Sequence, residues 1–377
     1  MIWSQDARTP FLHLYAASGD TLEQISAKYF AYYRLAVTTA FASLQTLSNP
    51  LYLRLFCEAN NPTRETTVNV HLGDQTTLMT LRKYLAGVRD NIAKKIDRPN
   101  GGALVEEGLR RYARELWQSD ARELPLAAAS QLLDGTSSES PHFKWSESIT
   151  KALLDEDLVI ARERGYQEPG HEVIRFTYDL LAGLIIAEGL IEGLGPRQAQ
   201  SIIASGIPLL TDQQHRHPLW DDISRCLCLI TPGRLGCHVY NLSSNSTLFS
   251  ASVHAIFEME PALVRPADAD LIQSLLRTES NRKALLPRLR ETSTVPSHPL
   301  NATFLDRVLH RMDITDRELS WTENLRQNPE RFHKFLSEVW GALNALKEGD
   351  LANLERIKLA GNPNKMAASI DATSPSG

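Results

Sequence analysis

Three cysteines and one neighbouring histidine have the types and spacing that could bind a metal ion. Cys226 and Cys228 lie two residues apart, and Cys237 is followed directly by His238. Thiolate and imidazole are the ligands that zinc prefers in tetrahedral sites. Leucines alternate with the first two thiols, however, in a stretch that is typical of a buried helix, where residues two apart point to different sides. The pattern favours buried structural cysteines over a zinc site.

The motifs of nucleotide and hydrolase chemistry are missing from the sequence. A phosphate-binding loop would read G-x-x-x-x-G-K-[ST], and the chain contains no Gly-Lys pair. Neither G-x-G-x-x-G nor G-x-S-x-G occurs. The stretch "HEVIR" begins like a zinc-protease helix, but Arg175 stands where the second His is required. Acidic pairs such as Asp221 and Asp222 are typical of solvated helix positions, so we expect no catalytic site in this chain.

Composition indicates a globular protein of two or three domains. The chain has 377 residues, of which 42% are hydrophobic and 23% charged. A net charge of −5 argues against a general binder of polyanions. Four cysteines are too few for a disulfide framework, and the first residues lack the basic and apolar regions of a signal peptide. We therefore expect a cytoplasmic protein.

The most apolar stretch is "IRFTYDLLAGLIIAEGLIEG", from Ile174 to Gly193. Its apolar part, Leu180 to Ile191, is only about 12 residues long and is interrupted by Gly183 and Glu188, whereas a membrane span needs about 20. The stretch therefore predicts a buried helix and no contact with a membrane.

Helical periodicity dominates the chain. Thr21 to Leu47 has one continuous helical rhythm with Asp20 or Thr21 as its N-cap, and Pro50 suits the first turn of the next helix. Further helices are predicted over residues 76–96, 101–119, 125–135, 217–230, 267–277, 281–291, 301–312 and 329–348.

The period changes between residues 144 and 194. Leu158–Arg162 and Glu172–Phe176 each alternate like strands, and the Gly- and Pro-containing stretch "ERGYQEPG" separates them. Two short strands around such a turn predict a β-hairpin, the only β-structure expected here. With a helix on each side, the hairpin predicts a winged-helix unit.

Three stretches of the chain carry a family resemblance when they are taken together. They are "KYFAYYRLAVTTAFASLQTLSNPLYLRLFCEAN", "LLDEDLVIARERGYQEPGHEVIRFTYDLLAGLIIAEGLI" and "HPLNATFLDRVLHRMDITDRELSWT". Together they resemble STAND-type NTPases (signal-transduction ATPases with numerous domains), in particular bacterial NACHT-like members of antiphage defence. The first is similar to the region after the nucleotide-binding core. The second is similar to the family's winged helix, and the third to its helical sensor arrays.

The resemblance implies a mainly α fold and a set of nucleotide-proximal residues. Asn49, Pro50 and Leu51 would open a helix beside the nucleotide base, and Arg175 would contact phosphate. Each also has a plain structural interpretation: Pro50 starts a helix, Arg175 is an exposed strand residue, and "RELSW" packs its apolar side chains. The implied segments are 1–60 (end of the nucleotide-binding core and start of a helical lid), 61–143 (helical domain), 144–194 (winged helix), 195–360 (solenoid-like sensor array) and 361–377 (disordered tail).

The resemblance also implies partners and cofactors that this chain does not hold alone. ATP or ADP with magnesium would bind through a P-loop core encoded upstream of Met1. A protein trigger, such as a phage protein, would be sensed by the helical array, and activation would assemble a homo-oligomer. The chain would thus be the regulatory and sensor portion of a switch, with ATPase activity only when the core is present.

Two other functions remain open at this point. A winged-helix regulator would bind DNA, but residues 144–192 carry five Lys or Arg against ten Asp or Glu, whereas DNA binding needs a basic face. A helical-repeat adaptor would bind proteins without any link to nucleotide.

Overall fold

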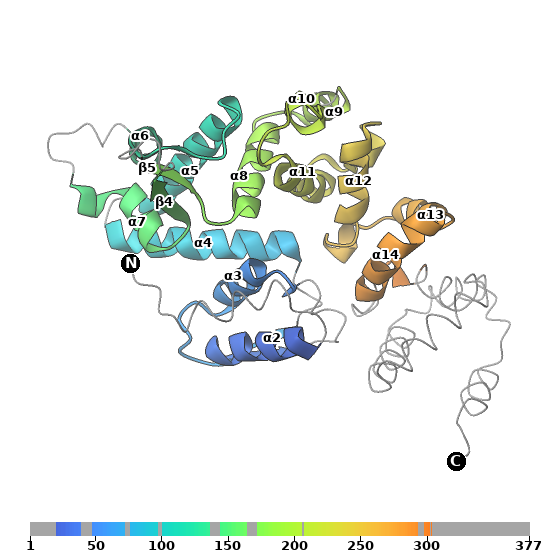
Figure 1. The fold of residues 1–377 in the computed structure, drawn as a ribbon, viewed down its shortest axis with the longest axis horizontal. Helices are drawn as coiled ribbons and strands as arrows, with labels where there is room; N and C mark the ends of the chain where they lie inside the picture. Colours follow the sequence, from blue (N-terminus) through green and yellow to red (C-terminus); the bar gives the residue numbers. More distant parts are fainter. Residues whose placement is uncertain are drawn as a thin grey trace, which may run out of the picture. The chain divides into compact units, whose positions relative to one another are not determined.

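The computed structural model describes residues 20–38, 47–71, 76–96, 100–135, 144–163, 172–205, 207–292, 298–301 and 303. The chain is mainly helical with a few short strands, as the sequence predicts (Figure 1). The segment 164–171 between the hairpin strands, the predicted helix at 329–348, nearly all of the one at 301–312, the "RELSW" segment and the predicted disordered tail lie outside the described residues.

The described helices and strands follow one another in a mixed order. The helices are α2 (Asp20–Tyr32), α3 (Pro50–Asn60), α4 (Thr77–Ile96), α5 (Gly101–Gln118), α6 (Leu126–Asp134), α7 (Ile149–Asp155), α8 (Asp179–Ile191), α9 (Pro196–Ala204), α10 (Pro208–Thr211), α11 (Trp220–Leu235), α12 (Ser246–Ala255), α13 (Pro266–Leu275) and α14 (Glu279–Thr292). The strands are β1 (Leu35–Thr38), β2 (Val68–His71), β3 (Leu124–Pro125), β4 (Val159–Glu163) and β5 (Glu172–Phe176). Short 3₁₀ helices are η4 (Trp145–Glu147), η5 (Val239–Asn241) and η6 (Pro261–Leu263).

Two compact units share the chain. The first comprises the described residues of Met1–Ala36, Asn49–Val70 and Gln75–Met259, and the second those of Val37–Ser48, His71–Asp74 and Glu260–Gly377. The predicted helical domain, the winged helix and the start of the sensor array therefore belong to one unit. Helices α13 and α14 belong to the other.

The predicted long helix from Thr21 to Leu47 is wrong, because α2 ends at Tyr32 and β1 follows. Arg34 adopts a left-handed backbone with φ 51°, which a helix does not tolerate. The chain is then fixed from outside, since Asn61 donates through Nδ2 to the carbonyl of Tyr33 at 2.8 Å. A β-branched valine and threonine in the next four residues favour the strand.

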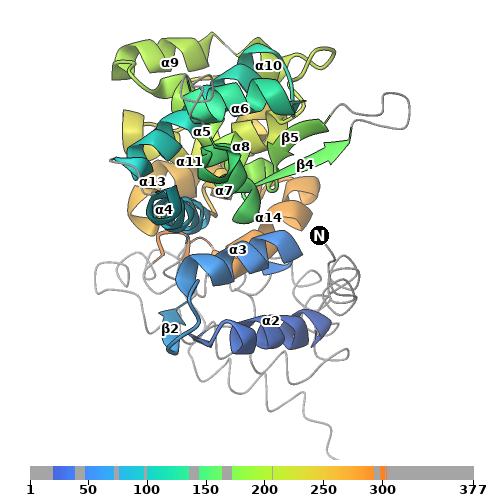
Figure 2. The same cartoon turned by 90° about the vertical axis from the view of Figure 1, so that its left-hand side faces the viewer.

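The winged-helix arrangement is larger than the sequence predicts. Strand β5 pairs antiparallel with β4 on one side and with β3 on the other, so the sheet has the order β3-β5-β4. Figure 2 shows β4 and β5 as two antiparallel arrows. The predicted boundary at residue 144 separates β3 and helices α5 and α6 from the hairpin that they pack with. Because β3 has only two residues, it shows no alternation of apolar and polar residues from which a strand could be predicted.

Helix α4 connects the winged-helix elements to the preceding helices. It packs against α3 on one side and against α5 and α7 on the other (Figures 1 and 2). Its buried side chains recur at helical spacing and include Leu81, Tyr84, Val88 and Ile92. This helix is the support on which the elements of the candidate site are placed.

The apolar stretch is the buried helix that the sequence predicts. In α8 every residue from Leu181 to Ala187 is buried, and the helix packs mainly against α11 and α5. The N-cap of α8 is Tyr178, and the hydroxyl of the preceding Thr177 donates to the carbonyl of Asp157. Among the described residues, no helix is long and apolar enough to cross a membrane.

Helix α11 organises the part of the predicted array that belongs to the first unit. It contacts α8, α9, α10 and α12, so these helices surround one central helix. Pro232 lies inside α11, and Gly236 ends the helix with a left-handed φ of 68°.

Candidate functional site

The start of α3 holds three of the four residues predicted to lie near nucleotide. Asn49 is the N-cap, and its Oδ1 accepts from the amides of Leu51 at 2.9 Å and Tyr52 at 3.2 Å. Pro50 is buried at the first helical position, whereas Asn49 is exposed and Leu51 half-buried. The structural role predicted for Pro50 is therefore present. The side-chain oxygen of Asn49 is already used by the helix.

Arg175 lies on β5, opposite Ile160 of β4. Its side chain is half-buried, and its Nε is buried without a hydrogen-bond partner in the described part of the chain. A guanidinium group with an unused donor retains the capacity to bind an anion. No hydrogen bond or ion pair among the described residues joins Arg175 to Asn49, Pro50 or Leu51.

A polar cluster that sequence reasoning missed links α3 to the winged helix. Arg54 donates through Nε to Glu58 at 2.8 Å and through Nη2 to Asp157 at 3.3 Å. The Tyr33 hydroxyl donates to the same Glu58 oxygen at 2.9 Å. Asp157 lies in the turn between α7 and β4 with a left-handed φ of 56°. We call Tyr33, Arg54, Glu58, Asp157 and the nearby Tyr178 the α3–wing joint.

The joint is sheltered from solvent by aromatic rings. The side chains of Arg54 and Glu58 are 20% and 18% exposed, and that of Asp157 is 34% exposed. The rings of Tyr84 and Tyr178 meet edge to face at 6.2 Å. Burial raises the pKa of Tyr178 to about 12 and also raises the pKa of Tyr33, so both phenols stay neutral at physiological pH.

The arrangement of the joint supports mechanical coupling and not catalysis. Tyr33, Arg54, Glu58 and Asp157 bond to one another, whereas the buried Tyr178 hydroxyl has no hydrogen-bond partner among the described residues. The described residues of the joint contain no nucleophile with an adjacent base. The sequence did carry a signal, since Arg54 and Glu58 are spaced i,i+4 in an otherwise apolar helix. The signal was incomplete because Asp157 lies 103 residues away from Arg54.

Two cysteines of the candidate zinc site lie in the interior of the first unit. Cys226 and Cys228 are buried, and burial raises the pKa of Cys228 to about 12. In the described residues, no group of three or more His, Cys, Asp or Glu side chains could hold a metal ion.

The prediction that Asp222 is simply solvated is wrong. It is half-buried between α11 and α8, and burial followed by repulsion from Asp179 raises its pKa to about 6.

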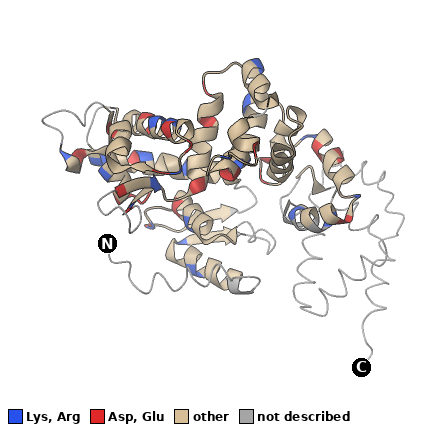
Figure 3. Ribbon diagram, turned by 45° about the horizontal axis from the view of Figure 1, so that its top comes forward, with Lys and Arg blue, Asp and Glu red and all other residues tan. Residues whose placement is uncertain are grey.

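The helix that a DNA-binding winged helix would present to DNA is capped by an acid. Asp134 accepts from the amides of Ile149 and Thr150 at the start of α7, at 2.5 Å and 3.4 Å. The helix end that would otherwise attract phosphate is thereby occupied. The basic Lys151 in α7 pairs with Asp155. Arg162 of β4 likewise pairs with Glu123, so these two cations of the described winged helix are matched by carboxylates, and Figure 3 colours the basic and acidic positions along the ribbon.

Comparison of the chain with protein-family models and with curated proteins finds no match.

Proposed function

We propose that this chain is the regulatory and sensor portion of a STAND-type NTPase that acts in antiphage defence or signalling. The observation that carries the proposal is the α3–wing joint. The helix opened by Asn49 and Pro50, which the family resemblance places beside the nucleotide base, is tied through Arg54 to Asp157 of a winged helix. A nucleotide-linked switch requires such a mechanical link.

The described residues offer at most part of a nucleotide site. Asn49 is exposed at the start of α3, whereas Pro50 and the Nε of Arg175 are buried, so a contact of these two with a base or a phosphate requires a different docking of their elements. Phosphate and magnesium also need a P-loop and acidic ligands, and the sequence has no Gly-Lys pair. ATP or ADP would therefore bind mainly to a separate core, which supplies the phosphate chemistry.

In this proposal, the residues of the α3–wing joint stabilise one position of α3 relative to the winged helix. Three half-buried polar contacts meet at Arg54 and Glu58. Such contacts depend on geometry, because each partner left alone keeps an uncompensated charge. A ligand shifts the equilibrium between two conformations only by the difference between its affinities for them. A joint that stabilises one conformation by only a few kcal/mol can therefore be opened by nucleotide binding.

Hydrogen exchange on the reconstituted protein tests the proposal. The full chain would be combined with a P-loop core, either as the product of the sequence preceding Met1 or as a second chain. We expect amides of α3 and of the turn at Asp157 to exchange more slowly with ADP than with a non-hydrolysable ATP analogue. Arg54→Met should abolish that difference. Arg162→Met, which breaks the pair between Arg162 of β4 and Glu123 next to β3, should preserve it.

Two results would contradict the proposal. One is a reconstituted protein that binds no nucleotide. The other is exchange in α3 that is identical with ADP and with the ATP analogue, which would favour an adaptor without any nucleotide link.

A further inference from the structure

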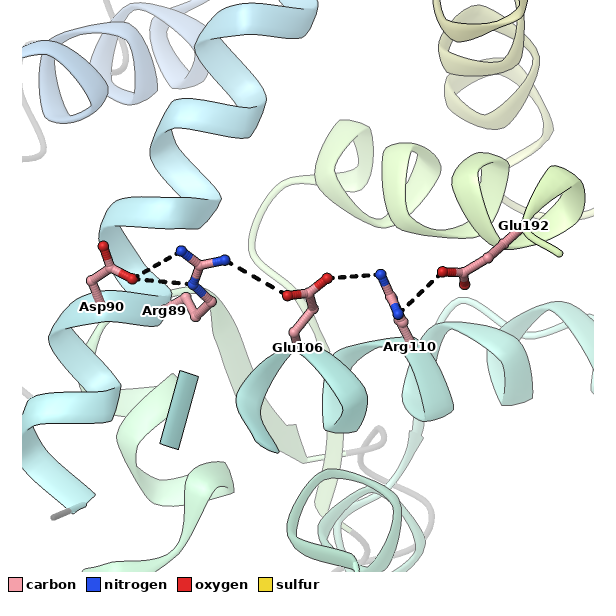
Figure 4. Close-up of polar contacts among 5 residues, drawn as sticks. All are labelled: Arg89, Asp90, Glu106, Arg110 and Glu192. Carbon is pink, nitrogen blue, oxygen red and sulfur yellow. Dashed lines mark hydrogen bonds and ion pairs between the residues drawn. The ribbon is translucent and has the colours of Figure 1, made fainter. Parts of the chain in front are cut away.

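A chain of ion pairs links α4, α5 and the end of α8, and it holds one arginine in place (Figure 4). Arg89 contacts Asp90 at 3.0 Å and Glu106 at 3.6 Å. Glu106 also pairs with Arg110 at 2.7 Å, and Arg110 reaches Glu192 at 3.1 Å. Surface pairs of this kind contribute little stability. Their geometric effect is to fix the Arg110 guanidinium between two carboxylates.

A pocket of about 60 Å³ opens beside this arginine, between α5 and α8. The buried Ala113, Ile185 and Ile186 line it together with Trp117. Its charged lining residues are Arg110 and Arg114 of α5 and Glu192 at the end of α8. The pocket is smaller than the ~150 Å³ cavity that accepts benzene, so it fits one branched aliphatic side chain.

The indole ring of Trp117, which lines the pocket, is held in place by a neighbouring histidine. His217 stacks on the indole with ring centroids 5.3 Å apart and an angle of 29°. The Nε2 of His217 lies 3.1 Å from the Leu116 carbonyl, and burial lowers the pKa of this histidine, which keeps it neutral. A wall fixed before binding loses little side-chain entropy when a ligand arrives.

Gly189 leaves one side of the pocket open. A Cβ added at this helical glycine would meet no heavy atom within 4 Å, whereas one at Gly183 would meet the backbone of Asp222 at 2.7 Å. Glycine inside a helix costs about 1 kcal/mol relative to alanine. Internal packing therefore explains Gly183 and does not explain Gly189, which is where an incoming chain would approach.

Arg114 supplies the unused charge at this pocket. It is exposed one turn after Arg110, and among the described residues it forms no hydrogen bond or ion pair. Arg110 is already neutralised by Glu106 and Glu192. A carboxylate placed beside an aliphatic group in the pocket would therefore meet the Arg114 guanidinium.

We propose that this pocket docks a short segment of a partner protein in which a branched aliphatic residue is followed by an acidic one. The aliphatic side chain enters the pocket against Trp117, and the carboxylate pairs with Arg114. The inference rests on pocket shape and charge alone, so it stands apart from any link to nucleotide.

Fluorine NMR of the full chain tests this docking. The chain has six tryptophans, and labelling with 5-fluorotryptophan gives each a signal, with that of Trp117 assigned by its loss in Trp117→Phe. The probes are acetyl-Leu-Glu-amide and its neutral isostere acetyl-Leu-Gln-amide. We expect a saturable shift of the Trp117 signal with about fivefold tighter binding of the acidic probe, as one exposed charge pair provides.

Variants separate the two contacts. Arg114→Gln should remove the preference for the acidic probe, and Gly189→Leu should fill the pocket and abolish binding of both. Gly87→Leu is the matched control, because Gly87 is also a helical glycine with open space around its Cβ and does not line the pocket. The other tryptophan signals report whether each variant is folded, and Gly189→Ala provides a milder second substitution.

Several results would overturn the proposal. One is the absence of any saturable shift of the Trp117 signal up to about 20 mM probe, a concentration that corresponds to binding too weak for a useful subsite. The others are equal affinity for the two probes, and binding that survives in a folded Gly189→Leu variant. A concentration-dependent dimer abolished by Gly189→Leu would also overturn it, because the occupant would then be a second copy of this chain.

Discussion

Two contacts of the first unit differ in what holds them together. The α8–α11 interface is made largely of buried apolar side chains, with Gly183 allowing the two helices to approach closely. The α3–wing joint is made of Arg54, Glu58, Asp157 and tyrosine hydroxyls. One contact rests on non-directional burial of apolar area, and the other on a few directional polar bonds.

This difference suggests which contact stays and which moves. Apolar burial tolerates small shifts without losing much free energy, so α8 and α11 should remain together as a single body. A polar joint loses its free energy when one partner moves by an ångström or two, and water then satisfies the freed groups. We therefore expect any conformational change in this unit to open the joint first.

The largest effect is expected from Gly183→Ala. The new Cβ would lie 2.7–2.9 Å from atoms of Asp222, so α8 and α11 must separate, at a cost of about 2–3 kcal/mol. Urea unfolding of the full chain measures this loss. Gly189→Ala on the same helix is the control and should be neutral or stabilising, since its Cβ meets nothing within 4 Å. Equal stability of the two variants would show that the interface is looser than described.

The pH dependence of this interface should be governed by Asp222. Its folded-state pKa of about 6, raised by burial and then by Asp179 and Asp221, exceeds the ordinary value of 3.8. The ionised carboxylate therefore destabilises the fold above about pH 6, and the penalty disappears as the pH falls toward 4. Asp222→Asn should be more stable than the wild type by about 1–2 kcal/mol at pH 7.

Urea unfolding at pH 7 and at pH 4 checks this prediction, and the advantage of Asp222→Asn should vanish at the lower pH. Asp221→Asn should show a smaller effect of the same sign, because Asp221 is exposed and raises the pKa of Asp222 less than burial does. An advantage of Asp222→Asn that stays constant with pH would assign the effect to packing and not to ionisation.

The polar joint should show coupling of about 1 kcal/mol between Arg54 and Asp157. Arg54→Met leaves Glu58 and Asp157 without their cation, and Asp157→Asn keeps a residue that tolerates the left-handed φ of 56°. The free energies of unfolding of the two single variants and the double variant give the coupling. If the losses in free energy of unfolding are strictly additive, the ion pair at 3.3 Å does not contribute to stability in solution.

The smallest effect is expected at the exposed pairs of Figure 4. Glu192→Ala removes one carboxylate from Arg110, whose side chain is 41% exposed. The loss of stability should be below about 0.5 kcal/mol and should disappear in high salt. Urea unfolding in low and high salt measures it, and a loss as large as that at Arg54 would remove the distinction between a surface network and a sheltered joint.

Local pattern was sufficient for many elements. The alternation in Glu172–Phe176 predicted β5, and the Asn-Pro pair at Asn49 and Pro50 predicted the start of α3. The apolar run after Tyr178 predicted the buried α8. In each case the signal lies within one turn or one strand, and neighbouring residues decide the conformation.

Other features needed distant parts of the chain. Helix α2 ends where Asn61 donates through Nδ2 to the carbonyl of Tyr33, and where the carbonyl of Glu65 accepts from Nη1 of Arg34. No window over residues 21–47 contains Asn61 or Glu65. The strand β3 exists because β5 lies beside it, with Leu124 opposite Ile174 and Pro125 opposite Val173. These partners are distant in the sequence. The half-burial of Asp222 arises from a glycine on another helix.

The sequence by itself determined a mainly helical chain, one β-hairpin, a buried apolar helix and a helix that starts at Pro50, because these depend on propensity and periodicity over short windows. Only the tertiary structure decided that Arg54 meets Asp157, that Asp222 is half-buried, and that α5 and α8 leave a pocket beside Trp117. Those features depend on which surfaces come together, and that is set by the packing of the whole unit.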